Sequence, residues 1–425
     1  MIAVVGGGVI GMAVAYFLGA AGNEVTIYDR DTFGNGCTSG SAGWITPSES
    51  APVVGPAAIR AVLGSLGRKS SPLYIKPGFD LDLYLWLARA ALYCNRRSAE
   101  HGFRSVVELS KSTFDLFNEL SVAGLDSMVK HDGLLHVFND ARVAADSLSA
   151  SQAMVPYGYR VPTSLLAGRE LHEVEPTLSS HATTGYLIEE ECHVDPAHLV
   201  ETLKVLLEKV GVLNREHEEI QRIFTSSGRV IMLETTSESV KVETLVVAGG
   251  MESRNLLKLV GVSLPMTAGK GYSFLHRLHT LPKRPVHLGD VKVALTPLER
   301  GLRVAGTMEL SGDNMRIRYE GVAAIERNAS RYFSDWNEIY RSGLPDAQDF
   351  EELWVGRRPL TPDGLPILDR VDPFTNLFLA TGHSMLGITL SLSSGKALSE
   401  FIISGKRPMV LDPFQLRRFR FPKNR

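Results

Sequence analysis

The chain has 425 residues, 44% of them hydrophobic, which is enough to bury a large core and to form two domains. Its 45 basic and 47 acidic residues give a formal charge of −2, so we expect no nucleic-acid partner. The three cysteines, Cys37, Cys94 and Cys192, show no C-x-x-C or metal-ligand spacing, which suits a reducing, cytoplasmic location. His131 and His136 lack an i, i+4 partner on a helix. We interpret them as structural residues and expect no metal site.

The first thirty residues predict a nucleotide-binding unit. Residues 2–5 form a short apolar run, typical of a buried parallel strand, which leads into the glycine pattern G-x-G-x-x-G at residues 6–11. Gly6 permits a sharp turn, Gly8 permits close approach of a pyrophosphate, and Gly11 permits the following helix to pack against the strand. The N–H groups that open this helix would face the phosphates.

Asp29 completes this pattern. A second predicted strand, residues 24–28, brings Asp29 to a position 18 residues after Gly11 (29 − 11). A carboxylate there can accept hydrogen bonds from the ribose hydroxyls of a dinucleotide. Residues 1–23 carry no charge, but the glycine pattern and the absence of a basic n-region favour a phosphate loop over a signal peptide or a membrane span.

The rest of the chain alternates between helical and strand-like patterns. Helices are predicted at residues 81–93, 98–127, 197–210 and 321–341. Strands that suggest an antiparallel sheet are predicted at residues 133–138, 185–188, 271–275, 291–295 and 302–307. The buried run at residues 240–247 ends in Ala248-Gly249 and suggests a second contact with the nucleotide.

These segments predict an α/β protein in which a Rossmann-like domain is interleaved with an α+β substrate-binding domain built on an antiparallel sheet. We assign residues 1–50, 195–262 and 352–425 to the nucleotide-binding domain, and residues 51–194 and 263–351 to the substrate-binding domain. An ordinary NAD dehydrogenase usually has a contiguous cofactor unit, so this layout disfavours NAD. The apolar helix at residues 81–93 is most simply core, and it is the segment we nominate for a peripheral contact with the inner face of the cytoplasmic membrane.

Eight motifs spread over nearly the whole chain indicate a family. They are VVGGGVIGMAVAYFL, CTSGSAGWITP, LYIKP, LVVAGG, KGYSF, LRVAGTMEL, GRRPLTPDGLPILD and TGHSMLGITLS. Together they resemble the amine-oxidising flavoproteins that include D-amino acid oxidase, glycine oxidase and sarcosine oxidase. The chain is most similar to bacterial D-amino acid dehydrogenases of the small-subunit type. The last two motifs, in this order and near the C-terminus, are the most specific.

The resemblance implies non-covalent FAD, since no cysteine lies near the C-terminal motifs. The implied cofactor-binding residues are Gly6, Gly8, Val9, Ile10, Gly11, Asp29, Arg30, Ser41, Ala42, Gly43, Trp44, Ile220, Ala248, Gly249, Gly382, Met385, Leu386, Gly387, Ile388 and Thr389. Where relatives commonly carry a serine followed three residues later by an asparagine, this chain has Thr38 and Ser41.

The same resemblance implies oxidation of an amino acid by hydride transfer from Cα to the flavin N5. Arg303 and Arg358 are the candidates for binding the substrate carboxylate, because the planar guanidinium can donate two parallel hydrogen bonds. Tyr272 would close over the carboxylate, and His383 would tune protonation near the flavin, although both residues also fit structural roles. We name no general base, because none is required if the amine enters neutral.

Several functions remain open at this stage. The main hypothesis is a D-amino acid dehydrogenase that passes electrons to a quinone or another carrier. The alternatives are an oxidase that uses O₂, of the glycine or sarcosine oxidase type, and an FAD-binding subunit without turnover of its own. Acidic, basic, cyclic and small side chains, with imino acids such as D-proline and D-hydroxyproline, all remain possible substrates.

Overall fold

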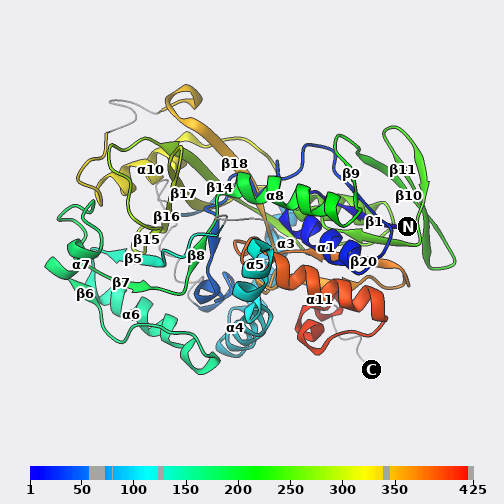
Figure 1. The fold of residues 1–425 in the computed structure, drawn as a ribbon, viewed down its shortest axis with the longest axis horizontal. Helices are drawn as coiled ribbons and strands as arrows, with labels where there is room; N and C mark the ends of the chain where they lie inside the picture. Colours follow the sequence, from blue (N-terminus) through cyan, green and yellow to red (C-terminus); the bar gives the residue numbers. More distant parts are fainter. Residues whose placement is uncertain (57–71, 79, 123–128, 338–344, 420–425) are drawn as a thin grey trace.

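The computed structural model describes residues 1–56, 72–78, 80–122, 129–337 and 345–419 (Figure 1). Parts of two predicted helices, residues 123–127 and 338–341, lie outside the described residues. The described part of the helix predicted at residues 98–127 forms two helices, α4 (Arg96–Ser110) and α5 (Thr113–Val122). None of the described helices is both long enough and apolar enough to span a bilayer.

A six-stranded sheet forms the nucleotide-binding half of the molecule. Its strands, in spatial order, are β19 (Ile367–Arg370), β20 (Leu377–Thr381), β13 (Thr244–Val247), β1 (Ile2–Val5), β2 (Val25–Tyr28) and β9 (Leu213–Arg215). All neighbours are parallel except β19, which runs antiparallel to β20. Segments from the start, middle and end of the chain therefore build one sheet, which confirms the predicted Rossmann-like, interleaved architecture; the domain boundaries stay a prediction.

Three helices pack together beside this sheet. Helix α1 (Val9–Ala20) contacts both α8 (Pro196–Lys209) and α11 (Ser391–Ser404), as Figure 1 shows on its right-hand side. Apolar side chains of all three share one core cluster with β1 and β2, and the buried face of α11 also carries four serines. A Cβ at Gly395 would lie 2.8 Å from Ala13, so glycine is needed where α11 crosses α1.

The glycine turn after β1 brings three backbone segments unusually close. Gly6 has φ +118°, and a Cβ there would lie 2.5 Å from the carbonyl oxygen of Ala248. A Cβ at Gly11 would lie 1.8 Å from the carbonyl oxygen of Gly6. Only glycine at both positions allows α1 to start against β1 and β13, as the sequence pattern predicts.

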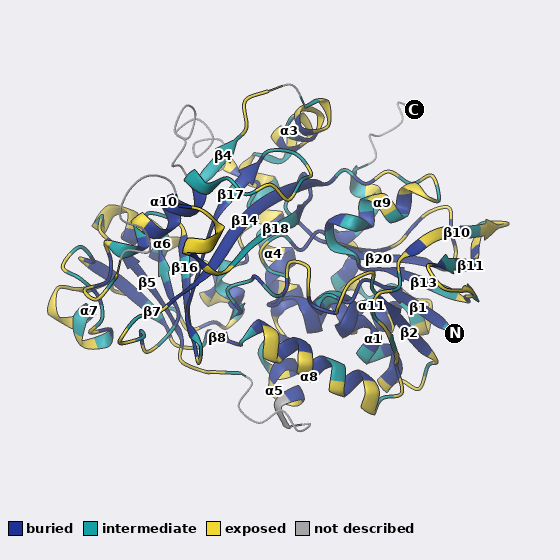
Figure 2. Ribbon diagram, turned by 90° about the horizontal axis from the view of Figure 1, so that it is seen from above, coloured by how far each residue is buried: buried dark blue, intermediate teal, exposed yellow. Residues whose placement is uncertain are grey.

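A nine-stranded sheet forms the other half. Its continuous path is β18 (Glu351–Leu360), β14 (Thr267–His276), β17 (Gly301–Leu310), β16 (Val293–Leu298), β15 (Val286–Leu288), β5 (Leu134–Phe138), β7 (Thr184–Ile188) and β6 (Leu166–Ala167), and β4 (Leu73–Ile75) pairs with β17. The sheet is mostly antiparallel, as predicted, but β15 pairs in parallel with β5, and β17 with β4. Helix α10 (Tyr319–Ser330) packs on one face. Figure 2 shows that the strands of both sheets are largely buried.

Smaller elements complete the fold. Strands β10 (Ile220–Ser226), β11 (Arg229–Thr235) and β12 (Ser239–Lys241) form a separate antiparallel sheet. Helices α6 (Ala141–Gln152) and α7 (Arg169–Val174) flank β5, β6 and β7, and α9 (Ser253–Lys258) follows β13. Helix α3 (Leu81–Tyr93) forms as predicted and lies at the edge of the molecule in Figure 2.

A buried carboxyl group fixes the segment that crosses between the two sheets. Strand β3 (Trp44–Ile45) pairs with β8 (Cys192–His193) and leads into the short helix η1 (Pro47–Glu49). The Ser48 N–H donates to Glu191 Oε1 over 3.0 Å, while Glu191 Oε2 is buried and has no hydrogen-bond partner among the described residues. Burial raises the pKa of the Glu191 carboxyl to about 8, so the neutral acid predominates near neutral pH.

We expect the substitution Gly11→Ala to destabilise the fold, because the new methyl group would overlap the Gly6 carbonyl oxygen. Overpacking of this kind typically costs about 1–3 kcal/mol. The free energy of unfolding, measured by denaturant titration, should fall by at least this amount. The control is Gly36→Ala, whose Cβ meets no atom within 4 Å. Equal stability of the two variants would contradict this account of the turn.

Glu191 should also make stability depend on pH. Its pKa is raised in the folded state, so the folded protein holds the proton more tightly than the unfolded chain. The contribution of this proton to the free energy of unfolding is complete below the unfolded pKa near 4.5 and is lost as the pH rises through about 8. Thermal unfolding should therefore show a larger loss of Tm between about pH 5 and pH 8 in the wild type than in Glu191→Gln, which imitates the neutral acid. The exposed neighbour Glu189, changed to Gln, should retain the wild-type pH dependence.

Candidate active site

A large pocket, with a cavity volume of about 1430 Å³, lies where the two sheets face each other. One wall comes from residues that follow β1, β2, β13 and β20, at the carboxyl ends of the parallel strands. The opposite wall comes from β16, β17 and β18 of the nine-stranded sheet. Ligands of open α/β sheets bind outside the carboxyl ends of the strands, which makes this pocket the candidate site.

Nearly all the predicted cofactor residues line this pocket. They are Gly6, Gly8, Val9, Ile10, Asp29, Arg30, Ser41, Ala42, Gly43, Trp44, Ile220, Ala248, Gly249, Gly382, Met385, Leu386, Gly387 and Ile388. Gly11 and Thr389 do not line it. Gly11 instead permits α1 to pack closely against β1. The Thr389 side chain connects the C-terminal loop to the segment at residues 44–46. Its hydroxyl donates a hydrogen bond to Trp44 O over 3.2 Å and accepts one from Thr46 N over 3.1 Å.

At one end of the pocket, Asp29 is held by the glycine turn. Its two carboxylate oxygens accept hydrogen bonds from Gly7 N, over 2.6 Å, and from Asp31 N, over 2.9 Å. Burial raises the pKa of the Asp29 carboxyl, and these backbone donors oppose that effect. Thr38, which departs from the family pattern, accepts a hydrogen bond from Val9 N through Oγ1 over 3.2 Å. The start of α1 therefore faces the pocket with a preformed hydrogen-bond network.

At the other end, a loop of residues 382–388 lies just before helix α11. His383 is buried in this loop, and its Nε2 atom lies 3.1 Å from Ser394 Oγ. Burial lowers the pKa of His383 to about 3, so its imidazole is neutral at physiological pH. A Cβ at Gly387 would meet no atom within 4 Å, which shows that open space lies over this backbone.

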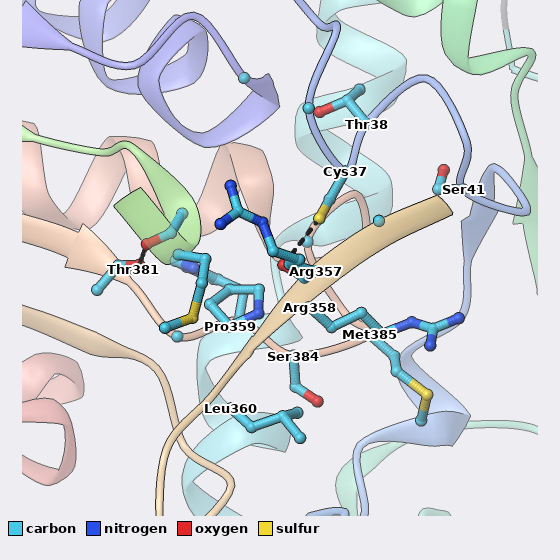
Figure 3. Close-up of a pocket in the computed structure, with 18 of the residues that line it drawn as sticks. Cys37, Thr38, Ser41, Arg357, Arg358, Pro359, Leu360, Thr381, Ser384 and Met385 are labelled. Atoms are coloured by element: carbon cyan, nitrogen blue, oxygen red, sulfur yellow. Dashed lines mark hydrogen bonds between the residues drawn. The ribbon is translucent and has the colours of Figure 1, made fainter. Parts of the chain in front are cut away.

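Arg358 extends into the pocket without an acidic partner. Its Nη1 donates to the Thr307 carbonyl oxygen over 2.8 Å, and no carboxylate within the described ranges pairs with it. Gly271 makes room for the guanidinium, because a Cβ there would lie 2.1 Å from Nη1. Arg357 points the other way from the same strand, as Figure 3 shows, and pairs with Glu252 and Asp313. Burial lowers the pKa of the Arg358 guanidinium.

The structure does not bring Arg303 and Tyr272 to the pocket, in contrast to the prediction for these two residues. Arg303 is buried two residues from pocket-lining Ala305, and its Nη2 pairs with Glu352 over 2.6 Å. Tyr272 lies on the face of the sheet covered by α10, where its hydroxyl donates to Glu309 over 2.8 Å. Strand alternation accounts for Tyr272, because successive side chains of a strand point to opposite faces. Arg303 shares the face of Ala305, but it lies two residues further along β17, where Glu352 holds its guanidinium.

A row of paired residues crosses the nine-stranded sheet at the pocket. In register order it contains Trp354, Ser273, Ala305, Ala294, His287, His136 and Tyr186. Four of them, Trp354, Ala305, Ala294 and His287, line the cavity and form its floor. The small side chains of Ala305 and Ala294 line the pocket and leave its volume open. Trp354 closes the row at one end, with its ring against Gly40 and Gly356.

Several polar residues of the pocket wall were not predicted from the sequence, and three of them lie together at one edge. Glu49, His287 and Lys292 all line the cavity, although they come from η1, β15 and the turn before β16. No motif marks them, because only the strand register and the crossing segment bring them together. His136, predicted to be structural, lies directly beside His287.

Known proteins show the same overall organisation. The chain is 31% identical to a D-amino acid dehydrogenase of Methylobacterium sp. (strain 4-46) over 98% of both chains, and 26% identical to one of Helicobacter pylori over 95% of both. The solved glycine oxidase of Geobacillus kaustophilus superposes with a TM-score of 0.73 at 23% identity over 98% of both chains. The L-proline dehydrogenase of P. horikoshii gives the same TM-score at 17% identity, over 98% of this chain and 97% of that one.

The match to the family is equally extensive. A sequence model described as "FAD dependent oxidoreductase" (DAO) matches residues 1–401, which include the glycine turn, the pocket floor and the C-terminal loop. The protein therefore belongs to the DAO family, and it is an FAD-dependent oxidoreductase.

Proposed function

We propose that the protein oxidises a D-amino acid, or a related cyclic imino acid, at its Cα–N bond and passes the electrons to a quinone or another carrier. Hydrolysis of the resulting imine would release a 2-oxo acid. The observation that carries the proposal is Arg358, a cation in the pocket wall that no acidic side chain of the described residues neutralises. The names of the curated relatives support the substrate class.

The pocket residues fit FAD. Gly6, Gly8, Val9 and Ile10 would hold the pyrophosphate, and a Cβ at Gly8 would meet only Thr38 Oγ1, at 3.7 Å, so the backbone there is open to a ligand. Asp29 and Arg30 would contact the ribose region and Ile220 the adenine. Bound FAD supplies the acceptor for the hydride that leaves Cα.

The remaining predicted contacts divide between the two sides of the flavin. Residues 41–44 would line one side, with Ala248 and Gly249 near the phosphates. Residues 382–388 would approach the ring from the start of α11, where backbone N–H groups favour negative charge. Neutral His383 would polarise this region without adding a charge.

Arg358 would bind the substrate carboxylate through two parallel hydrogen bonds. The partly buried position strengthens such a contact, because few water molecules compete for the guanidinium. Ala294 and Ala305 would leave room for the side chain of the substrate on the pocket floor. Arg303 and Tyr272, which lie outside the pocket, take no part in this proposal.

Helix α3 is the proposed route to a membrane-bound acceptor. Leu81, Leu85 and Leu92 are 58%, 52% and 62% exposed and follow one stripe of the helix, together with Ala88. Trp86 and Leu87 line the pocket. Exposed Arg89 lies on α3, and exposed Arg96 and Arg97 open the next helix, α4, a combination that suits an anionic lipid surface.

The activity can be tested by anaerobic absorbance titration of the yellow protein with D- and L-amino acids. Loss of the flavin band near 450 nm with D-amino acids, followed by faster recovery with a quinone analogue than with air, would support the proposal. Faster recovery in air would favour the alternative, an O₂-using oxidase of the glycine oxidase type. If no amine bleaches the flavin, an FAD-binding subunit without turnover becomes the better account.

We expect Arg358→Met to lower kcat/KM by about 10²–10³, because hydrogen bonds to charged groups contribute about 1.5–3 kcal/mol each. Most of the change should appear in KM, and Arg358→Lys should restore part of it. Arg303→Lys is the matched control and should leave KM unchanged, because Arg303 pairs with Glu352 away from the pocket. An unchanged KM in Arg358→Met would remove Arg358 from the substrate site.

The membrane contact predicts a specific loss of vesicle binding. The double substitution Leu85→Glu and Leu92→Glu should reduce sedimentation with phosphatidylglycerol vesicles by at least tenfold, since burial of one leucine contributes about 1.5–3 kcal/mol. Ile231→Glu, at another exposed apolar position, should bind like the wild type. Equal binding by all three proteins would argue against α3 as the contact surface.

A further inference from the structure

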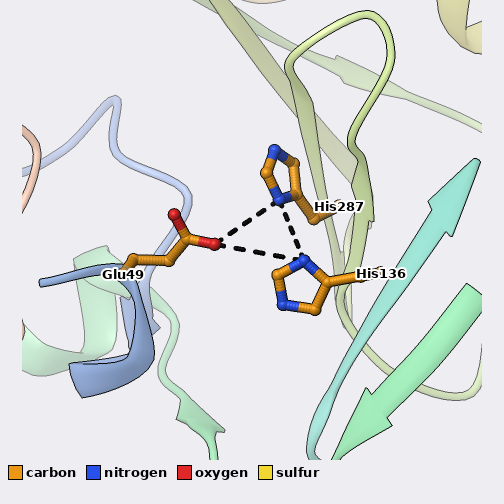
Figure 4. A group of neighbouring side chains, drawn as sticks. All are labelled: Glu49, His136 and His287. Atoms are coloured by element: carbon orange, nitrogen blue, oxygen red, sulfur yellow. Dashed lines mark hydrogen bonds and ion pairs between the residues drawn. The ribbon is translucent and has the colours of Figure 1, made fainter. Parts of the chain in front are cut away.

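Glu49, His136 and His287 converge on one point at the edge of the pocket (Figure 4). They come from η1, β5 and β15, and the parallel register of β5 and β15 places the two histidines directly beside each other. The two Nδ1 atoms lie 3.2 Å apart. Glu49 Oε1 lies 3.6 Å from Nδ1 of His287 and 4.0 Å from Nδ1 of His136.

Two of these separations, 3.2 and 3.6 Å, are close to the edges of a metal coordination polyhedron. With zinc–ligand bonds of about 2.0–2.2 Å, tetrahedral geometry sets neighbouring ligand atoms about 3.3–3.5 Å apart. Both contacts to the carboxylate are longer than a hydrogen bond, which leaves a central gap between the three atoms. The Glu49 side chain is 38% exposed, so a small rotation can shorten the 4.0 Å edge.

We propose that Glu49, His136 and His287 form a three-ligand site for a divalent transition metal, with Zn²⁺ as the best-fitting ion. Two imidazole nitrogens and one carboxylate oxygen are a donor set that zinc uses where it keeps an open coordination position. The site does not depend on the proposed oxidation reaction.

A cation also lies at the edge of this cluster. Lys292 lines the cavity together with Glu49 and His287, so a bound metal would have to tolerate a second positive charge nearby.

Neighbouring aromatic side chains hold the two imidazoles in place. Tyr186 stacks on His136 with ring centroids 4.5 Å apart, and Trp44 packs edge-on against His287 at 5.7 Å. Trp44 is itself anchored, because its Nε1 donates to Thr296 Oγ1 over 2.9 Å. Preorganised ligands reduce the cost of assembling a site on metal binding.

The open position of the metal faces the pocket. Glu49 and His287 both line the cavity, whereas His136 lies behind them, only 1% exposed. A fourth ligand can therefore come from water or from an oxygen donor, such as a carboxylate or hydroxyl group, of a molecule in the pocket. Because Trp44 also lines the predicted flavin region, the metal would adjoin the site of oxidation.

The test is zinc binding by the FAD-loaded protein after treatment with a chelator, without any amino acid present. Isothermal titration and elemental analysis should give one Zn²⁺ per chain, and zinc should raise the Tm. Glu49→Gln and His287→Asn should each weaken binding by at least about 100-fold, more than the 10–100-fold that outer-shell changes cause. His198→Gln, at an exposed histidine on α8, should bind zinc like the wild type.

Two results would overturn the proposal. One is the absence of stoichiometric binding to the wild type, which would identify a hydrogen-bonded histidine pair instead. The other is unchanged binding in folded, FAD-containing Glu49→Gln and His287→Asn, which would place the zinc elsewhere. Since binding is measured without turnover, a protein that binds zinc but is not bleached by amino acids would refute only the proposed oxidation.

Discussion

The fold depends on the close approach of three backbone segments at Gly6, Gly11 and Ala248. Helix α1 can begin at the end of β1 only if no side chain occupies the gap, because a Cβ at Gly11 would overlap the Gly6 carbonyl oxygen. The same contact brings β13, more than 200 residues later, against the turn. With α1 in place, α8 and α11 pack on it and complete the core beside the six-stranded sheet.

The nine-stranded sheet supplies a surface whose properties follow from its register. Small residues at Ala294 and Ala305 leave space opposite the glycine turn, whereas Trp354 and His287 occupy the same row on either side. Two arginines of this sheet differ in their partners. Arg303 is neutralised by Glu352, while Arg358 has only a backbone carbonyl as partner among the described residues. An uncompensated cation near a cavity is costly unless a ligand supplies the anion.

The segment from Trp44 to Glu49 is held by hydrogen bonds to other parts of the fold. It pairs with β8, accepts a hydrogen bond from Thr389 at Trp44 O, and is held by the buried acid Glu191 at Ser48. One short piece of chain thus carries a residue of the predicted flavin region and a ligand of the proposed metal site. A change in its position would affect both, so the stability of this segment links the cofactor pocket to the cluster beside it.

The sequence by itself determined the nucleotide-binding unit. The glycine spacing and Asp29 lie within one continuous strand–turn–helix–strand segment, so its geometry depends on residues that are close together in the chain. It also indicated the interleaved architecture and most pocket residues, through motifs that resemble those of the family. Tertiary structure alone decided which arginine enters the pocket, since Arg358 lines the cavity, whereas Arg303 lies further along its strand and pairs with Glu352. It also decided that Glu49, His136 and His287 meet. The histidines are 151 positions apart in the sequence, and only the parallel register of β5 and β15 makes them neighbours.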